Sequence, residues 1–131
     1  MAPSKCVLAA TFPVQTAFSA TNTNFAQQNT VDVNITGCVG YAVKFSSCNT
    51  DGGSAAGSNR NNYRLYNAAG TAVAVGGQGI NNQYCNADLW GAYITYVFAG
   101  TAGSCQTHTF KQGCHEGYAC SGFVNILVTG Y

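Results

Sequence analysis

The sequence predicts an all-β fold, a sandwich or a barrel, from three observations. Short apolar segments rich in Val, Ile, Tyr and Phe are separated by turns rich in glycine and asparagine, which is typical of strands and hairpins. Helical periodicity nowhere persists long enough to indicate a helix. Apolar and polar residues alternate instead, most clearly over 31–45, VDVNITGCVGYAVKF, which places one face of a sheet against a core and the other in water.

The predicted elements follow in order along the chain. Residues 6–14, CVLAATFPV, are predicted as the first strand, with Pro13 at an edge, a bulge or a strand end. The polar residues 16–30 are expected to form a connection lying over the sheet. The stretch 31–45 is either two strands or one long strand kinked at its central glycines. Within it, Cys38 is either the anchor of a disulfide or simply a small buried side chain.

The middle of the chain alternates loops and strands. Residues 46–62 combine Gly, Ser and Asn with almost no apolar side chains and are predicted as a surface loop. Residues 62–77 form a predicted hairpin, because two strand-like segments flank a four-residue turn that ends in Gly70. Residues 76–92 form the second large loop. Residues 93–98, YITYVF, carry apolar groups on both faces and are expected near the centre of the structure.

The C-terminal part begins with a glycine-containing segment, 99–122, that holds three of the seven cysteines and both histidines. It is followed by a predicted strand over 123–131, FVNILVTGY, that runs to the last residue. With 131 residues, the chain is predicted to be a single domain, 1–131, with one core.

Composition and hydropathy argue against a nucleic-acid partner and against a membrane-spanning helix. Charged residues make up only 7% of the chain, and the net charge is +1. Such a surface offers no basic footprint for a phosphate backbone, so we expect no nucleic-acid partner. No apolar run reaches the roughly 18 residues of a spanning helix, so the chain is not expected to be membrane-spanning.

The cysteines indicate an oxidising, extracellular compartment and a framework of about three disulfides. Seven occur in this short chain: Cys6, Cys38, Cys48, Cys85, Cys105, Cys114 and Cys120. The odd number leaves one cysteine over, which is buried and inert, bridged to another chain, or a functional nucleophile.

Five residues near the C-terminus have the side chains of a zinc site: Cys105, His108, Cys114, His115 and Cys120. Their spacing is irregular and the compartment is oxidising, so disulfides are favoured over metal, and no metal or cofactor is expected. The two histidines are expected to be exposed loop residues rather than general bases.

An enzymatic function is not expected. A serine nucleophile needs an elbow such as G-x-S-x-G, and the sequence contains none. Asp88 and Glu116 are the pair that would serve a small secreted hydrolase. Four acidic residues in the whole chain leave few groups to hold and tune such a pair.

The best candidate for a binding site is the loop 76–92, in which aromatic residues are interleaved with side-chain amides and a carboxylate. Aromatic faces stack on sugar rings, and amides and carboxylates hydrogen-bond to hydroxyl groups. The alternative is that Trp90 and Tyr93 plug one end of the fold. The candidate ligand-binding residues are Asn81, Asn82, Tyr84, Asp88, Trp90 and Tyr93.

Four pieces of the chain follow one another in a recognisable order. They are Cys6-Val7-Leu8, then 33–38 (VNITGC) with 41–43 (YAV), then 62–70 (NYRLYNAAG) with Gly76-Gly77, and finally 122–131 (GFVNILVTGY). In this order they resemble the spore coat U domain, the module that also makes the pilins of archaic chaperone–usher pili. The resemblance implies an immunoglobulin-like or jelly-roll-type β-sandwich, a Cys6–Cys38 bridge, no catalytic centre, and a role in surface filaments or adhesion.

The expected function is that of a non-enzymatic, secreted or cell-surface binding domain, pilin-like or adhesin-like, that adheres or assembles. Its expected partners are a cell-surface glycan or protein, or copies of itself. The alternative is of a different class, a secreted, cysteine-rich effector or toxin-like protein acting on a host target. A small secreted hydrolase is the third hypothesis.

Overall fold

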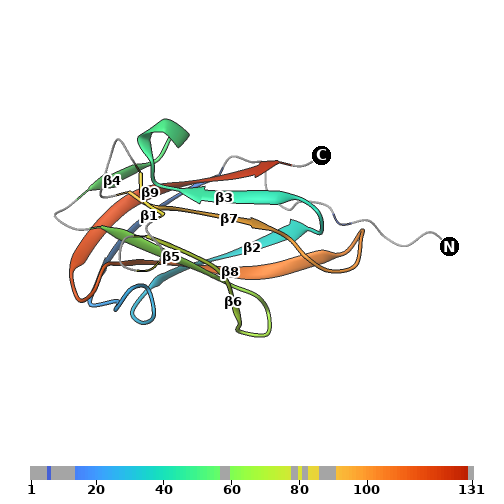
Figure 1. The fold of residues 1–131 in the computed structure, drawn as a ribbon, viewed down its shortest axis with the longest axis horizontal. Helices are drawn as coiled ribbons and strands as arrows, with labels where there is room; N and C mark the ends of the chain where they lie inside the picture. Colours follow the sequence, from blue (N-terminus) through green and yellow to red (C-terminus); the bar gives the residue numbers. More distant parts are fainter. Residues whose placement is uncertain are drawn as a thin grey trace.

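The protein is a β-sandwich, as the sequence predicts. The computed structural model describes Cys6 and residues 14–56, 60–77, 80, 83–85 and 91–129. These residues form two antiparallel sheets packed face to face, with one 3₁₀ turn and no α-helix among them (Figure 1). Within the same ranges, no helix has the length and apolar character needed to cross a membrane.

We call the two sheets the β9 sheet and the β8 sheet after their longest strands. In the β9 sheet the strand order is β1-β9-β3-β7, with β4 also paired to β9. Its strands are β1 (Val14–Thr21), β3 (Ala42–Ser46), β4 (Ser54–Ala56), β7 (Tyr93–Val97) and β9 (Ala119–Thr129). In the β8 sheet the order is β2-β8-β5-β6. Its strands are β2 (Val31–Cys38), β5 (Asn61–Tyr66), β6 (Ala72–Gly77) and β8 (Cys105–Cys114), and the 3₁₀ turn η1 (Asn49–Asp51) lies between β3 and β4.

The alternating stretch 31–45 forms two strands, and they belong to different sheets (Figure 1). β2 ends at Cys38, Gly40 takes a positive φ of 93° in the turn, and β3 follows. Ile35 on β2 and Phe45 on β3 are both buried, so the apolar parity faces the core from both sides. The stretch is therefore one of the connections that cross from one sheet to the other.

The core lies between the sheets and is dominated by aromatic rings. Phe45 of the β9 sheet stacks on Phe110 of the β8 sheet with ring centroids 4.1 Å apart, and both side chains are fully buried. Tyr63 extends this layer, 5.3 Å from Phe110 and 6.0 Å from Phe18. Burial of each such side chain contributes about 1.5–3 kcal/mol through the hydrophobic effect, so this layer holds the two sheets together.

Two predicted elements are confirmed with small changes in their bounds. The hairpin predicted over 62–77 is formed by β5 and β6, and the Asn67 side chain accepts hydrogen bonds from two backbone N–H groups of its turn, at 3.1 and 2.9 Å. The predicted last strand, 123–131, is confirmed up to residue 129 as part of β9, which begins earlier, at Ala119. The predicted loop 46–62 contains η1 and β4.

The prediction of a connection over 16–30 is wrong for its first part, because residues 14–21 form β1 and pair with β9. The inward positions of β1 carry Val14, Thr16, Phe18 and Ala20, and only Phe18 among them is buried. The alternation is therefore too weak to mark a strand by hydropathy. Of the predicted first strand, 6–14, the structure describes only Cys6 and Val14.

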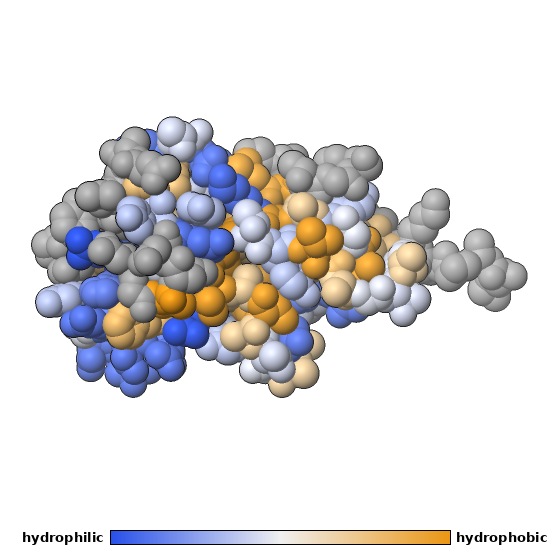
Figure 2. Space-filling view, in the orientation of Figure 1, coloured by the Kyte–Doolittle hydropathy of each residue, from blue (hydrophilic) through white to orange (hydrophobic). Residues whose placement is uncertain are grey.

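β7 lies at the edge of the β9 sheet, not near the centre of the structure where 93–98 was predicted. Val97, on the outward face of this strand, is 57% exposed. Figure 2 shows hydrophobic side chains reaching the surface in the middle of this face, over β6 and β7, whereas hydrophilic residues gather at the end that carries the β1–β2 connection.

β8 is a ten-residue strand inside the segment 99–122, where the sequence indicates no strand. His108, Phe110 and Gln112 face the core, and two of these three are polar, so hydropathy alone conceals the alternation. The expectation that both histidines are exposed is wrong for His108, which is only 3% exposed.

The disulfide framework is confirmed in number but corrected in its pairing. All seven cysteines lie among the described residues and form three bridges, Cys6–Cys105, Cys48–Cys85 and Cys114–Cys120, with Cys38 left over and buried. The expected Cys6–Cys38 bridge is wrong. Cys105 begins β8 directly opposite Cys38, so the sulfurs of Cys38 and Cys105 both lie close to the sulfur of Cys6. Cys6 is bonded to Cys105. Three disulfides fit an oxidising compartment.

Candidate functional site

Two of the six predicted ligand-binding residues, Tyr84 and Tyr93, lie among the described residues. The other four, Asn81, Asn82, Asp88 and Trp90, lie outside them. Tyr84 pairs with Ala92 in an isolated antiparallel bridge, and the backbone N–H of Tyr93 donates to the Gln83 carbonyl at 3.3 Å. The structure thus brings the two partly buried tyrosines to opposite sides of the base of the loop 76–92.

A disulfide fixes the base of this loop to the turn after β3. Cys85 is bonded to Cys48, and the Cys85 backbone N–H donates to the Gly91 carbonyl at 3.1 Å. A Cβ on Gly91 would lie 2.7 Å from the Cys85 Sγ, so only glycine permits this close approach. The predicted loop therefore leaves the sandwich from a rigid base.

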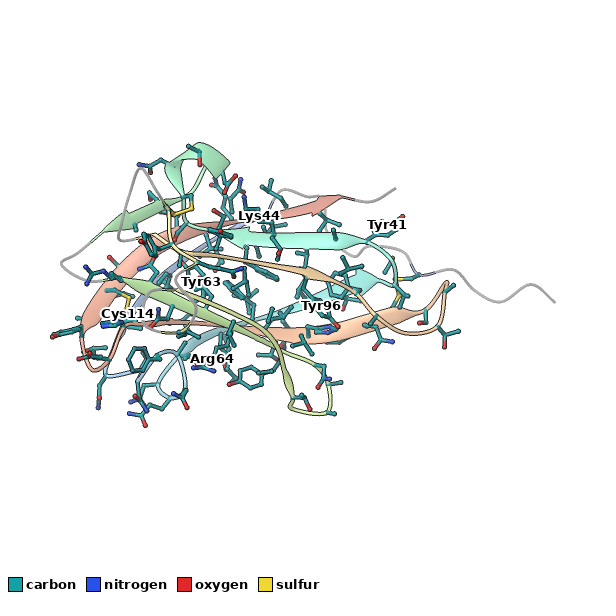
Figure 3. All side chains as sticks on the ribbon, in the orientation of Figure 1. Tyr41, Lys44, Tyr63, Arg64, Tyr96 and Cys114 are labelled. Carbon is teal, nitrogen blue, oxygen red and sulfur yellow. A yellow bond between two sulfur atoms is a disulfide. The ribbon has the colours of Figure 1, made fainter. Side chains whose placement is uncertain are left out.

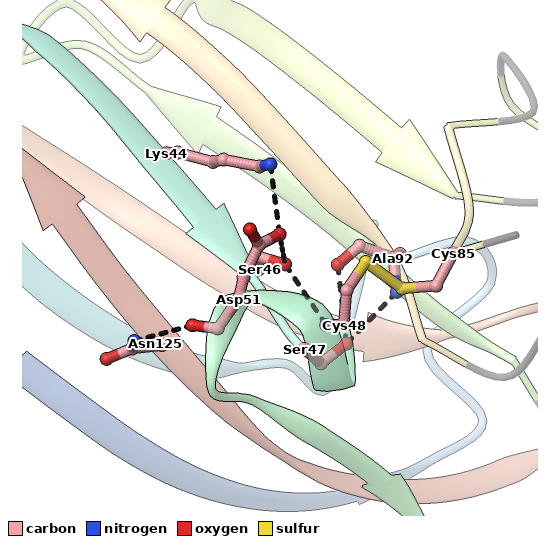
Figure 4. A network of polar contacts seen from close by, with 8 residues as sticks. All are labelled: Lys44, Ser46, Ser47, Cys48, Asp51, Cys85, Ala92 and Asn125. Atoms are coloured by element: carbon pink, nitrogen blue, oxygen red, sulfur yellow. Dashed lines mark hydrogen bonds and ion pairs between the residues drawn. A yellow bond between two sulfur atoms is a disulfide. The ribbon is translucent and has the colours of Figure 1, made fainter. Parts of the chain in front are cut away.

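A buried polar network lies under that base. The hydroxyl of Tyr63 lies 2.6 Å from the Ser47 Oγ and 2.8 Å from the Asn61 Oδ1, and all three residues are fully buried. The Ser47 Oγ also accepts the Ala92 backbone N–H at 3.0 Å, one of the contacts drawn in Figure 4. Because buried polar groups are costly unless paired, this network fixes the position of Ala92.

Lys44 and Asp51 form an ion pair on the outer side of the same end (Figure 4). The Lys44 Nζ lies 2.9 Å from the Asp51 Oδ2 and 5.2 Å from the centroid of the Tyr93 ring. Burial raises the pKa of Asp51, but the hydrogen bond from the Ser46 hydroxyl and the nearby Lys44 outweigh it and lower the pKa below its ordinary value of 3.8. Asp51 is therefore a fixed carboxylate with a structural role, because a proton donor at neutral pH needs a raised pKa.

A second site, which the sequence did not indicate, is a shallow depression on the outer face of the β8 sheet. Its volume is about 720 Å³, and it lies where β2, β8 and β5 run side by side. Its lining combines an aromatic ring with side-chain carboxylate, amide, hydroxyl and ammonium groups: Gln27, Asp32, Asn34, Tyr66, Asn67, Thr109 and Lys111, beside Ala68 and Gly70.

Cross-strand register arranges these side chains in two rows. In one row, Asn34, Thr109 and Tyr66 occupy directly opposed positions on β2, β8 and β5. The Thr109 hydroxyl donates to the Asn34 Oδ1 at 3.1 Å. Opposed residues on one sheet face have Cβ atoms about 4.5–5.5 Å apart, so this row is a continuous platform.

The second row consists of Asp32, Lys111 and Arg64. The Lys111 Nζ donates to the Asp32 Oδ2 at 3.1 Å and lies 5.5 Å from the centroid of the Tyr66 ring. Arg64 lies on the same side of the sheet (Figure 3), and its Nε donates to the Phe25 carbonyl at 2.7 Å. Asp32 and Lys111 remain partly exposed, with 42% and 32% of their side-chain surfaces open to solvent.

The histidines do not form a metal site with the cysteines near them. Cys105, Cys114 and Cys120 are all consumed by disulfides. His108 packs between Tyr96 and Phe98, with ring centroids 5.3 and 5.1 Å away, and burial lowers its pKa below 6.5 despite a partly offsetting contact to the backbone of Gln106.

Of the two carboxylates in the hydrolase hypothesis, only Glu116 lies among the described residues. Asp88 lies outside the described residues, and Glu116 is 56% exposed, 3.4 Å from the Nε2 of His115. His115 forms ring contacts with Phe25 and Tyr118, with centroids 4.9 and 6.2 Å away. The hypothesis of an Asp88–Glu116 pair stays a prediction.

Comparison with known proteins assigns no family. No family model matches the chain, and no curated protein matches it.

Proposed function

We propose that this chain is a non-enzymatic, secreted or cell-surface adhesion domain that binds carbohydrate through the outer face of its β8 sheet. One observation carries the proposal: the ring of Tyr66 lies in one depression with four hydrogen-bonding side chains that are exposed or partly exposed. They are Asp32, Asn34, Thr109 and Lys111.

The chemistry of these groups matches that of a sugar. A sugar ring has an apolar face that stacks on an aromatic side chain and hydroxyl groups that both donate and accept. The Asp32 carboxylate accepts, the Lys111 ammonium donates, and the side chains of Asn34 and Thr109 do both. A ligand lying across the two rows would meet the aromatic ring and these polar groups together.

The ion pair in the depression does not prevent binding. An exposed pair such as Asp32 and Lys111 contributes only about 0–1 kcal/mol, so sugar hydroxyls can replace it at little cost. The groups stand on three adjacent strands, so ordering them costs less entropy than ordering a flexible loop.

The disulfides support the extracellular part of the proposal, because three bridges suit an oxidising compartment. The pilin-like role, with copies of the chain as partners, rests on the resemblance alone.

The test is retention of the purified chain on immobilised glycans, followed by affinity measurements on the retained ones. We expect Tyr66→Ala to weaken binding about tenfold or more, because the stacking energy of one aromatic ring is worth about 0.5–1.5 kcal/mol beyond its buried area. Lys111→Gln should also weaken binding. Tyr118→Ala is the matched control, because Tyr118 is 48% exposed but lies outside the depression.

Other outcomes separate this proposal from its alternatives. If Tyr66→Ala binds normally while Trp90→Ala or Tyr84→Ala does not, the sheet-face site is wrong and the loop 76–92 carries the binding. Absence of retention on any glycan, together with capture of one defined host protein, would favour the effector hypothesis. Turnover of the glycan that is lost in Glu116→Gln would favour the hydrolase.

A further inference from the structure

Three cysteines meet at the end of the sandwich away from the Cys48–Cys85 bridge. The Sγ atoms of Cys6, Cys38 and Cys105 all lie within 4.8 Å of one another. Cys6 is bonded to Cys105, and Cys38, at 6% exposure, is the only free cysteine of the seven. A free thiol next to a disulfide has the composition needed for thiol–disulfide exchange.

The backbone holds the three sulfurs together from three segments. Cys38 ends β2 and Cys105 begins β8, directly opposite each other at the last pair of a continuous antiparallel register. The Cys6 backbone N–H donates to the Gly103 carbonyl at 2.9 Å, and the Cys6 Sγ lies 3.8 Å from the Gly37 carbonyl. Cys6 therefore contacts the segments that carry both other cysteines, and it can bond to either one without separating β2 from β8.

The three sulfurs differ in their access to solvent. Cys38 is buried, at 6% exposure. Cys6 is half-buried, and Cys105 is exposed.

We propose that this cluster is a covalent attachment site, in which exchange inside the domain delivers a reactive thiol to the surface at Cys105. The Cys38 thiolate attacks the Cys6 Sγ, the Cys6–Cys38 bond forms, and the Cys6–Cys105 bond breaks. Cys105 leaves as a thiolate and takes up the proton that Cys38 gave up. One disulfide and one thiol are present before and after the step, so no oxidant or reductant is required.

The exposed Cys105 thiol then loses its proton to solvent and reacts as a thiolate with an accessible disulfide of a partner molecule. A bond forms between the Cys105 Sγ and one partner sulfur, and the other partner sulfur leaves as a thiolate. The substrate class is therefore an accessible disulfide, whether of a small molecule or of a second copy of the chain. The inference does not rest on carbohydrate binding, because the cluster shares no residue with the depression on the β8 sheet.

The experiment uses the oxidised full chain with glutathione disulfide as the probe. The protein is incubated with the probe, quenched with acid, alkylated, and mapped as non-reduced peptides by mass spectrometry. In the wild type we expect glutathione on Cys105 together with a Cys6–Cys38 bridge. In Cys38→Ser we expect the adduct to be lost and the Cys6–Cys105 bridge to persist.

Controls separate exchange from a folding defect. The same map reports whether Cys48–Cys85 and Cys114–Cys120 are intact, and Cys38→Ala provides a second variant without the attacking thiol. Cys105→Ser, folded under the same oxidising conditions as the wild type, should already contain the Cys6–Cys38 bridge before the probe is added. A disulfide-linked dimer of the concentrated protein that is lost in both Cys38→Ser and Cys105→Ser would identify a second copy as the disulfide source.

Three results would overturn the proposal. The first is glutathione attached to Cys38 while Cys6–Cys105 stays intact. The second is an adduct on Cys105 that persists in Cys38→Ser. The third is a wild type that forms neither adduct nor dimer although its Cys38 thiol is labelled after denaturation.

Discussion

The two ends of the sandwich are closed by different chemistry. At the polar end, which we define by Ser47, Asn61, Tyr63 and the Cys48–Cys85 bridge, the buried side-chain oxygens contact one another at 2.6–3.0 Å. At the sulfur end, defined by Cys6, Cys38 and Cys105, three sulfurs lie within 4.8 Å and only two of them are bonded.

The difference shows how chemistry decides whether an arrangement is unique. A buried hydrogen-bond network specifies one arrangement, because a donor left without its acceptor costs about 1–3 kcal/mol. Three adjacent sulfurs specify no single pairing, because any two of them form the same kind of bond. We therefore expect the polar end to tolerate no change of partner and the sulfur end to exchange partners.

The largest effect is expected from removing bridges at the two ends. Cys48→Ala/Cys85→Ala should lower the free energy of unfolding by about 4 kcal/mol, because the freed loop regains its chain entropy. Cys105→Ala should cost only about 1 kcal/mol, because Cys38 takes over Cys6 and closes a shorter loop. Denaturant unfolding of the two variants measures the contrast.

A double variant is the control for this contrast. In Cys6→Ala/Cys105→Ala the remaining Cys38 has no nearby partner, so the loss should rise to about 4–5 kcal/mol. Equal losses for Cys105→Ala and for the double variant would show that Cys38 does not replace Cys105, and the comparison between the two ends would fail.

The second prediction concerns the network at the polar end. Tyr63→Phe removes the hydroxyl that contacts Ser47 and Asn61, so their buried polar atoms lose a partner without any change in ring packing. We expect a loss of about 1–3 kcal/mol in the free energy of unfolding. Tyr118→Phe, at an exposed tyrosine, should stay within about 0.5 kcal/mol of the wild type. Similar losses in both variants would contradict the structural role of the network.

The third prediction separates the ends by pH. Burial lowers the pKa of His108, which lies on the sulfur-end half of β8, so the unfolded chain binds a proton before the folded one does as pH falls. The folded state therefore has its full stability, as far as His108 is concerned, above pH 6.5. That stability is lost as the pH decreases from 6.5 through the lowered pKa of His108. The lowered pKa of Asp51 acts at the polar end, where stability present above pH 3.8 is lost only in stronger acid.

Unfolding free energies measured across this pH range test the assignment. His108→Leu should remove the decline that begins near pH 6.5 and leave the decline below pH 3.8. His115→Gln, which keeps the buried histidine, should retain both declines. A wild type whose stability is constant from neutral pH down to about pH 5 would contradict the assignment to His108.

The smallest effect is expected at the ion pair of the polar end. Lys44→Gln removes a partly exposed partner of Asp51 while the Ser46 hydrogen bond remains, so the loss should be about 0.2–1 kcal/mol. The acid decline of the variant should also be smaller and should end at higher pH, because the pKa of folded Asp51 rises toward 3.8 without the lysine while that of the unfolded chain is unchanged. A loss as large as that of Tyr63→Phe would show that the ion pair, not the buried network, fixes this end.

The candidate site was only partly predictable from the sequence. Aromatic and amide residues cluster along the chain in 76–92, and that cluster is what the sequence indicated. The depression on the β8 sheet gathers Asp32, Tyr66 and Lys111 from three separate segments. Their proximity follows from strand register, which no single segment encodes, and the polar inward residues of β8 concealed even the strand that joins them.

Sequence alone predicts the class of fold, the core-facing residues of the stretch 31–45, the hairpin over 62–77 and the number of disulfides. Each of these features depends on a short segment or on a simple count. Alternation indicates which face of a strand is buried, turn residues indicate where the chain reverses, and the number of cysteines limits the number of disulfides. The tertiary structure decided which strands are neighbours and therefore which cysteines meet. The pairing of β2 with β8 placed Cys38 opposite Cys105, and no spacing along the chain determines that juxtaposition.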